Sequence, residues 1–299
     1  MSLFDRYGPH EALVAPARPK AQIWRLFMGL VLIAGVFLAA NQFVHQTLGT
    51  LLGRDGYARL TGLDGRTSQL SMIFLLLSFG MIIIAVVVAL RVAHQRGFSE
   101  VLGNSIEFRN QFASVLTILL ILNAAVFILP PWGMGEPLVA NVSLGAWLWV
   151  LPFAVFAILV QVSAEEILFR GYLQQQLAAR FSNPIIWILT PALLFGWGHY
   201  APKELGENAV HFVVWSAIFG IFMADLTARA GTLAPAIAVH LVNNLVAILL
   251  VSLPGSLSGL SLYLTPFSLN DTATIRAWLP VDFMMIFVSW LAARLALRR

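Results

Sequence analysis

Two adjacent glutamates, Glu165 and Glu166, lie in a strongly apolar stretch of the chain. Charged residues make up only 11% of the protein, so two neighbouring carboxylates in such a segment are conspicuous. An ionisable side chain inside a membrane is a candidate functional residue, because pairing or chemistry has to offset its desolvation. The alternative is that both acids cap or line a helix end close to the lipid headgroups.

Helical geometry separates the two glutamates. Residues four apart share a helix face, and an acid that precedes a base by four residues is the favourable order, as in Glu166 and Arg170. Glu165 points about 100° away from Glu166 on a helix with about 3.6 residues per turn. We therefore expect Arg170 to neutralise Glu166 and leave Glu165 free for chemistry.

A histidine ends a later apolar segment, in the sequence Phe195-Gly-Trp-Gly-His199. The glycines at 196 and 198 remove side chains next to the histidine, which permits close helix approach or leaves room for a substrate backbone. His199 is a candidate functional residue. The alternative is an interfacial or packed histidine.

A third polar group follows in His240-Leu-Val-Asn-Asn244. His240 and Asn244 are four residues apart and share a helix face, which Asn243 borders. Polar residues on one side of an apolar helix are expected to face the protein interior or a wet cavity. Hydrogen bonding between helices is the alternative role.

The three groups are predicted to meet at a similar depth. Glu165 and His199 lie 17 residues before and after residue 182, where the chain turns between two apolar segments. His240 lies 10 residues after the turn near residue 230. At about 1.5 Å per residue, these distances correspond to roughly 25 Å and 15 Å, and a helix that extends beyond the membrane would absorb the difference.

A cluster of Glu, His and Asn side chains can hydrolyse a peptide bond without a protein nucleophile. A carboxylate and a histidine activate water, while a second histidine and an amide stabilise the oxyanion. The same side chains offer a zinc site, with Glu165, His199 and His240 as ligands, because two His and one Glu form a known catalytic set. The His-Glu-x-x-His signature is absent, and spacing leaves both schemes open.

The composition is that of a membrane protein. The chain has 299 residues, of which 59% are hydrophobic, and its mean hydropathy is +0.83. Soluble domains are about 45–50% apolar and about 25% charged. The chain has no cysteine, which excludes a cysteine protease. The net charge of +4 comes without a basic run, so no nucleic-acid partner is expected.

Eight apolar segments approach the roughly 20 residues that a spanning helix requires. They lie near 23–43, 70–92, 112–130, 143–164, 184–200, 208–228, 233–252 and 277–296. With eight crossings, thirteen Lys and Arg residues fall on one side and five on the other. The positive-inside rule then places both termini in the cytoplasm. The expected fold is an all-α polytopic membrane protein with a polar cavity between the fourth, fifth and seventh segments.

The chain divides into three expected parts. Residues 1–111 would hold an N-terminal cytoplasmic tail, two transmembrane helices and an interfacial segment near 98–111. Residues 112–252 would form the catalytic core. Residues 253–299 would form a loop and the last transmembrane helix.

The motifs Glu165-Glu166-x-x-x-Arg170, Phe195-x-x-x-His199 and His240-x-x-x-Asn244 occur in this order on successive apolar segments. In this arrangement the chain resembles the CPBP intramembrane proteases. This family includes the type II CAAX prenyl endopeptidases and their bacterial bacteriocin-processing or immunity (Abi-like) relatives. The resemblance covers roughly residues 112–252.

The resemblance implies an eight-helix intramembrane endopeptidase. It implies that Glu165 and His199 activate water and that His240 and Asn244 hold the oxyanion. The adjacent Asn243 is the alternative to Asn244 for this role. No cofactor is required in this scheme, although the family is often labelled metalloprotease. Eukaryotic relatives cleave a prenylated C-terminal CAAX peptide, whereas in a bacterial protein the substrate would be a membrane-associated peptide or protein. The expected location is a bacterial inner membrane.

Two other functions remain open from the sequence. A transporter or channel would use buried Glu and His side chains as an ion or proton path. However, no inverted repeat or pair of broken helices is evident in the sequence. A non-catalytic immunity or scaffold protein on the same fold is the other alternative. The oligomeric state is left open.

Overall fold

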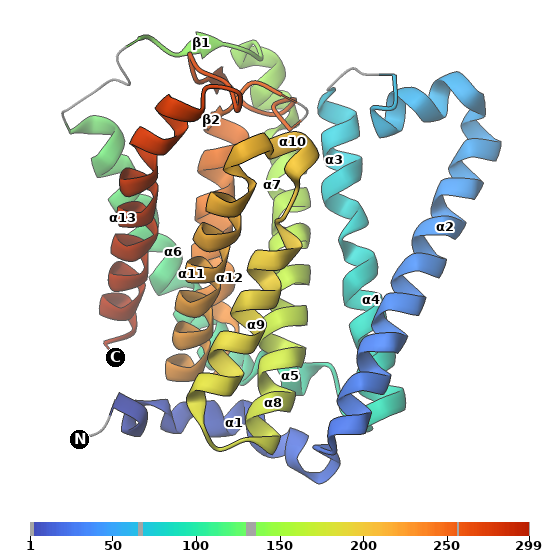
Figure 1. The fold of residues 1–299 in the computed structure, drawn as a ribbon, viewed down its shortest axis with the longest axis vertical. Helices are drawn as coiled ribbons and strands as arrows, with labels where there is room; N and C mark the ends of the chain where they lie inside the picture. The colour runs from blue at the N-terminus through green and yellow to red at the C-terminus, as the bar shows by residue number, and fades with distance from the viewer. Residues whose placement is uncertain (1–2, 65–67, 130–135, 256, 299) are drawn as a thin grey trace.

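The computed structural model describes residues 3–64, 68–129, 136–255 and 257–298 as a bundle of helices (Figure 1). The helices of the first half are α1 (Glu11–Val14), α2 (Ile23–Thr61), α3 (Gln69–Ser78), α4 (Gly80–Ala89), α5 (Ser99–Leu102) and α6 (Ser105–Ile128). Those of the second half are α7 (Leu144–Glu166), α8 (Gln174–Arg180), α9 (Pro184–Gly198), α10 (Pro202–Leu205), α11 (Ala209–Ala230), α12 (Ala234–Asn244) and α13 (Thr272–Leu297).

Short segments of other geometry connect or extend these helices. Three are 3₁₀ helices, η1 (Leu3–His10), η2 (Ala15–Lys20) and η5 (Gly206–Asn208). Three are π-helical, η3 (Leu90–His94), η4 (Ile167–Leu173) and η6 (Leu245–Leu250). The strands are β1 (Val139–Ala140), β2 (Val251–Ser252) and β3 (Tyr263–Leu264).

The protein is an all-α polytopic membrane protein, as the sequence predicts. Within the described residues, six continuous helical segments are long and apolar enough to cross a membrane: Ile23–Thr61, Gln69–His94, Ser105–Ile128, Leu144–Arg180, Pro202–Ala230 and Thr272–Leu297. The two other expected segments form shorter apolar helices, Pro184–Gly198 and Ala234–Leu250. These two shorter helices carry the histidine and asparagine motifs.

Several helix boundaries in the structure differ from those expected from the sequence. The helix that begins with α7 continues through η4 and α8 to Arg180, well past the expected end at 164. The expected interfacial segment near 98–111 is divided between α5 and the first turns of α6. Gly103 separates them with φ +90°, and a Cβ there would lie 2.6 Å from the carbonyl oxygen of Gly231. Residue 130, the expected end of the third segment, lies outside the described residues.

Both termini lie at the same end of the bundle (Figure 1). At this end the N-terminal segment η1–α1–η2 packs against α8 and α11. Tyr7 donates a hydrogen bond to Asp225 Oδ1 at 2.7 Å, and Asp225 also pairs with Arg229 at 2.8 Å. The Asp225–Arg229 ion pair, between residues four apart on α11, is therefore extended by the N-terminal segment.

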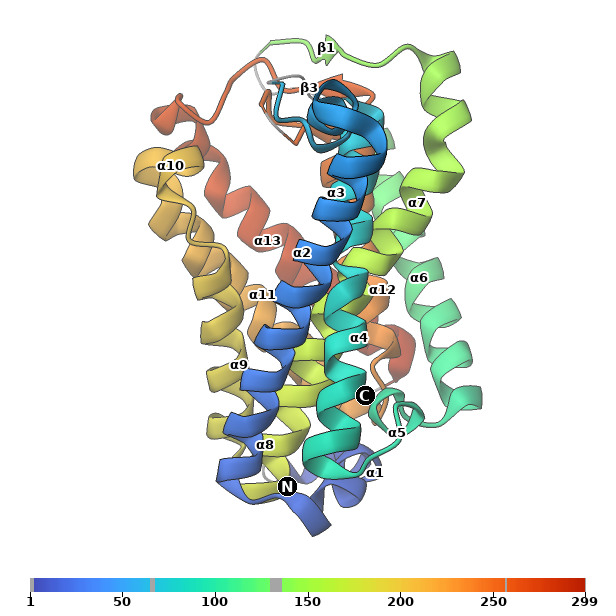
Figure 2. The same ribbon diagram turned by 90° about the vertical axis from the view of Figure 1, so that its right-hand side faces the viewer.

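The strands form a small sheet at the end of the bundle opposite the termini (Figures 1 and 2). The strand order is β1-β3-β2, with β1 antiparallel and β2 parallel to β3. In register, Val139 pairs with Leu264 and Val251 pairs with Tyr263. This sheet ties the chain before α7 to the chain after α12.

Helices α9 and α11 pack closely because glycines lie at their contact. A Cβ on Gly196 would lie 2.6 Å from the carbonyl oxygen of Val213, and a Cβ on Gly220 would lie 2.9 Å from Cα of Ala192. Gly198 has no atom within 4 Å of such a Cβ. Of the two glycines noted beside His199, Gly196 serves helix packing and Gly198 faces open space.

Candidate active site

The three motif-bearing helices each change geometry at a motif residue. Helix α7 ends at Glu166, where the π-helical η4 begins. Helix α12 ends at Asn244, where the π-helical η6 begins. Helix α9 stops at Gly198, and His199 is its C-cap residue. A π-helical turn re-aims side chains relative to an α-helix and is frequent at functional sites.

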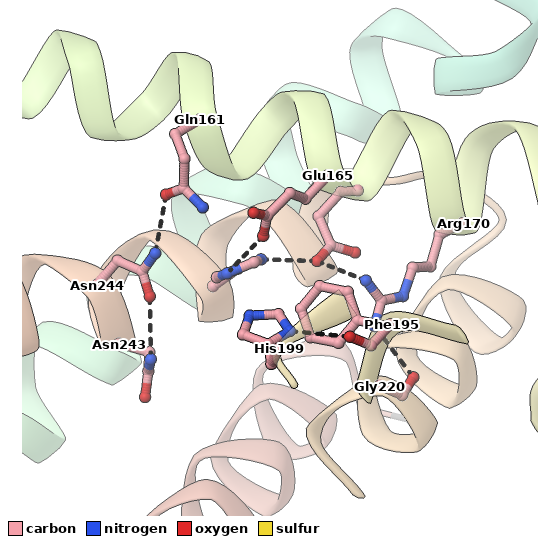
Figure 3. A network of polar contacts seen from close by, with 10 residues as sticks. Gln161, Glu165, Arg170, Phe195, His199, Gly220, Asn243 and Asn244 are labelled. Atoms are coloured by element: carbon pink, nitrogen blue, oxygen red, sulfur yellow. Dashed lines mark hydrogen bonds and ion pairs between the residues drawn. The ribbon is translucent and has the colours of Figure 1, made fainter. Parts of the chain in front are cut away.

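Glu166 is held by two partners. Its Oε1 atom accepts hydrogen bonds from Arg170 Nη1 at 3.0 Å and from His240 Nδ1 at 2.8 Å. The side chains of Glu166 and Arg170 are both 0% exposed, so the ion pair is fully enclosed. The pairing of Glu166 with Arg170 expected from their spacing is present (Figure 3).

His240 lies between the two glutamates. Its Nδ1 contacts Glu166, and its Nε2 is 3.5 Å from Oε2 of Glu165. A carboxylate paired with Arg170 can only accept, so the Nδ1 atom of His240 carries a proton. Glu165 does not pair with Arg170, as the sequence predicts, but it does lie close to His240. The i,i+4 rule considers one helix at a time and could not reveal the approach of His240 from α12.

His199 is oriented by its own helix. Its Nδ1 is 2.8 Å from the carbonyl oxygen of Phe195. Because a carbonyl only accepts, Nδ1 is the donor and Nε2 of the neutral ring is left as an acceptor. His199 is half-buried, at the edge of the cluster. It therefore presents a basic nitrogen away from its own helix.

The ring of Phe195 links the parts of the cluster. Its centroid lies 4.6 Å from that of His199 and 6.0 Å from that of His240. The guanidinium carbon of Arg170 lies 4.7 Å from the same ring centroid. Phe195 thus contacts His199, His240 and Arg170 at once, which gives the aromatic motif residue a physical role.

Asn244 forms a chain of amides across two helices. Its Nδ2 donates to Oε1 of Gln161 at 2.9 Å, and its Oδ1 accepts from Nδ2 of Asn243 at 3.1 Å (Figure 3). Gln161 lies outside the three sequence motifs and was not predicted as a site residue. The available signal was its position four residues before Glu165, which places both on one face of α7.

The structure brings together Glu165, Glu166, Arg170, Phe195, His199, His240, Asn243 and Asn244 from α7, η4, α9 and α12. The sequence predicted a polar cavity here. Glu165 is 9% and His240 4% exposed, whereas His199, Asn243 and Asn244 are half-buried.

A zinc site would need Glu165, His199 and His240 close enough to share one ion. Among the described residues, no group of three or more His, Asp or Glu side chains is placed to hold a metal ion. The candidate ligands Glu165, His199 and His240 thus do not form a zinc site as they lie.

Comparison with known proteins agrees with this cluster. Residues 146–246, which hold all three motifs, match the family model described as "Type II CAAX prenyl endopeptidase Rce1-like". The predicted family resemblance is confirmed. The chain also resembles an uncharacterized protein, YyaK, of Bacillus subtilis (strain 168), with 24% identity over 259 residues. That match covers 83% of this chain and 84% of the relative. No solved structure matches.

The match to a peptidase family supports a hydrolase activity in general for this integral membrane protein. It begins near the start of α7 and ends just after the last motif. The matched segment therefore contains the whole polar cluster, while α2 to α6 and α13 lie outside it.

Proposed function

We propose that this protein is an intramembrane endopeptidase that hydrolyses a peptide bond of a membrane-associated peptide or protein. The single observation that carries the proposal is that the two glutamates have different contacts. Arg170 and His240 both bind Oε1 of Glu166, whereas Oε2 of Glu165 has no hydrogen bond among the described residues and lies 3.5 Å from Nε2 of His240. Oε2 of Glu166 is likewise enclosed without a donor, so the difference between the two glutamates is the pair of bases that hold Glu166. An enclosed carboxylate oxygen without a donor is costly, and a bound water molecule would satisfy it.

In this mechanism Glu165 and His199 activate the water molecule. A water molecule between them gives a proton to Glu165 or to Nε2 of His199, and its oxygen attacks the carbonyl carbon of the substrate. The peptide π electrons move to the carbonyl oxygen, which becomes an oxyanion. The held proton then passes to the leaving nitrogen as the C–N bond breaks, giving a carboxylate and an amine after proton transfer.

His240 and Asn244 stabilise the oxyanion in this mechanism by donating hydrogen bonds to it. One N–H of Asn244 is used by Gln161, and the second remains available to a substrate oxygen. His240 donates from Nε2 when the ring carries both protons. In that state His240 and Arg170 together balance the charges of Glu165 and Glu166, so the cluster is neutral overall.

A membrane orientation accompanies this mechanism. We place both termini in the cytoplasm of a bacterial cell, on the side richer in Lys and Arg. The position of both termini at one end of the bundle supports an even number of crossings (Figure 1). Reporter fusions at residue 299 and in the 253–271 loop would test this orientation, with opposite readouts expected at the two sites.

The decisive experiment measures cleavage of a library of membrane-embedded peptides by the purified protein in liposomes. Glu165→Ala and His199→Ala should each abolish cleavage while the thermal unfolding temperature stays close to that of wild type. Glu107→Ala and His45→Ala are the matched controls, because Glu107 is exposed and His45 bonds Tyr57 on α2, and both should cleave normally.

Retained cleavage in both Glu165→Ala and His199→Ala would overturn the assignment of the site. A wild-type protein that carries ions across the liposome membrane but cleaves no peptide would favour the transporter alternative. A wild-type protein that does neither would favour a non-catalytic scaffold or immunity function.

A further inference from the structure

The amide of Gln161 lies inside the polar cluster and is unexplained by the three motifs. Gln161 is 7% exposed, on the face of α7 that also carries Glu165 one turn later. Its Oε1 accepts from Asn244 at 2.9 Å, whereas its Nε2 has no hydrogen-bond partner among the described residues. A nearly buried amide in an apolar helix needs a reason to be there.

The side-chain amide of Asn244 has two possible orientations, and a neighbouring group has to select one of them. An asparagine amide has nearly the same shape after a 180° turn, but only one orientation presents an N–H to an oxyanion. The oxygen of Asn244 already accepts from Asn243, and its nitrogen donates to Gln161. Both contacts select the same orientation, and the contact to Gln161 is the one that reaches across to α7.

The orientation of Gln161 itself follows from electrostatics. In Figure 3 the amide nitrogen of Gln161 lies on the side of Glu165, and its oxygen lies on the side of Asn244. An ionised carboxylate one helical turn away attracts the NH₂ end of the amide dipole and repels the carbonyl end. Glu165 thereby directs the Gln161 oxygen toward Asn244.

We propose that Gln161 is a positioning residue that fixes the Asn244 amide with its N–H groups toward the site. This inference rests on the proposed function and adds a residue to its oxyanion site. Gln161 acts through Asn244, so its effect should appear in the chemical step. Substrate binding should change little, because Gln161 itself makes no bond to the substrate in this scheme.

The test is a double-mutant cycle that combines Gln161→Ala with Asn244→Ala. For each variant, kcat and KM are measured on a peptide in liposomes that the wild-type protein cleaves, and Glu165→Ala is the inactive reference. Gln161→Ala should lower kcat by about tenfold to hundredfold, less than or similar to loss of an oxyanion donor itself. KM should stay near the wild-type value. Adding Gln161→Ala to Asn244→Ala should cause no further loss, because the two residues act as one unit.

Two more variants keep the test decisive. Gln161→Met keeps a similar volume in the membrane span but lacks the acceptor oxygen, so it should fold and show the same loss of kcat even if Gln161→Ala unfolds. Asn123→Ala is the matched control, since among the described residues the Asn123 amide bonds only the Leu119 carbonyl of its own helix, and it should cleave normally.

The outcomes separate the two proposals. Wild-type kcat in Gln161→Met, or a loss that multiplies with that of Asn244→Ala, would overturn the role of Gln161 while the endopeptidase proposal stands. A wild-type protein that cleaves no peptide overturns both proposals.

Discussion

Glu166 and His240 are joined by a 2.8 Å hydrogen bond that links α7 to α12 across 74 residues of chain. The bond fixes which nitrogen of His240 carries a proton and leaves the other nitrogen facing Glu165. Since Glu166 is also bound to Arg170, one carboxylate serves as the structural anchor of the cluster. The second carboxylate, Glu165, is the one that the proposed mechanism uses.

The Glu166–Arg170 pair should be critical for stability. Arg170→Met leaves an enclosed carboxylate without its cation, so the free energy of unfolding should fall by roughly 3–5 kcal/mol. The double variant Glu166→Gln/Arg170→Met should lose less than the sum of the single variants, because it leaves no unpaired charge. Chemical denaturation in detergent micelles measures these differences.

An exposed pair provides the control for that prediction. Arg276 and Glu207 lie 3.6 Å apart with largely exposed side chains, so Arg276→Met should change stability by less than about 1 kcal/mol. Equal losses from Arg170→Met and Arg276→Met would mean that the enclosed pair is not the anchor inferred here.

The packing glycine of α9 should control activity through His199. Gly196→Ala places a methyl group 2.6 Å from the Val213 carbonyl oxygen, which forces α9 and α11 apart. We expect about a hundredfold lower cleavage, since a displacement of about 1 Å in a site can cost that much. Gly198→Ala, where the methyl group meets nothing within 4 Å, should retain wild-type cleavage. Equal effects of the two substitutions would contradict this account.

Acid should destabilise the N-terminal segment through His10. Burial lowers the pKa of His10 from 6.5 to about 4, and the ring packs 4.7 Å from Trp187. Between these pH values the unfolded state binds a proton that the folded state does not, so stability falls as pH decreases. The contribution is fully present above about pH 6.5, and up to roughly 3 kcal/mol is lost by about pH 4.

His10→Phe keeps an aromatic ring against Trp187 and removes the titrating group. Its thermal unfolding temperature, measured from pH 7.5 to pH 4.5, should fall less steeply than that of wild type. Parallel pH curves for the two proteins would show that His10 does not contribute.

Chelation should leave cleavage intact if Glu165 and His199 activate water directly. Elemental analysis of the purified protein should find less than one zinc per chain, and dialysis against a chelator should not lower the cleavage rate. One zinc per chain, with cleavage lost on dialysis and restored by zinc, would instead support Glu165, His199 and His240 as ligands.

The helical content, the membrane class and the family resemblance all followed from the sequence. A long apolar segment can satisfy its backbone in a bilayer only as a helix, so composition alone determines those elements. The pairing of Glu166 with Arg170 was equally accessible, because residues four apart meet on any α-helix. These features depend on local geometry, which the order of residues fixes directly.

Contacts between helices were decided by the tertiary structure. The bond from His240 to Glu166, the amide chain through Gln161 and the separate roles of Gly196 and Gly198 depend on how α7, α9, α11 and α12 are rotated against one another. The π-helical turns after Glu166 and Asn244 change that rotation within a single turn. No sequence period reports such a change, because it arises from the packing of side chains that are far apart in the chain.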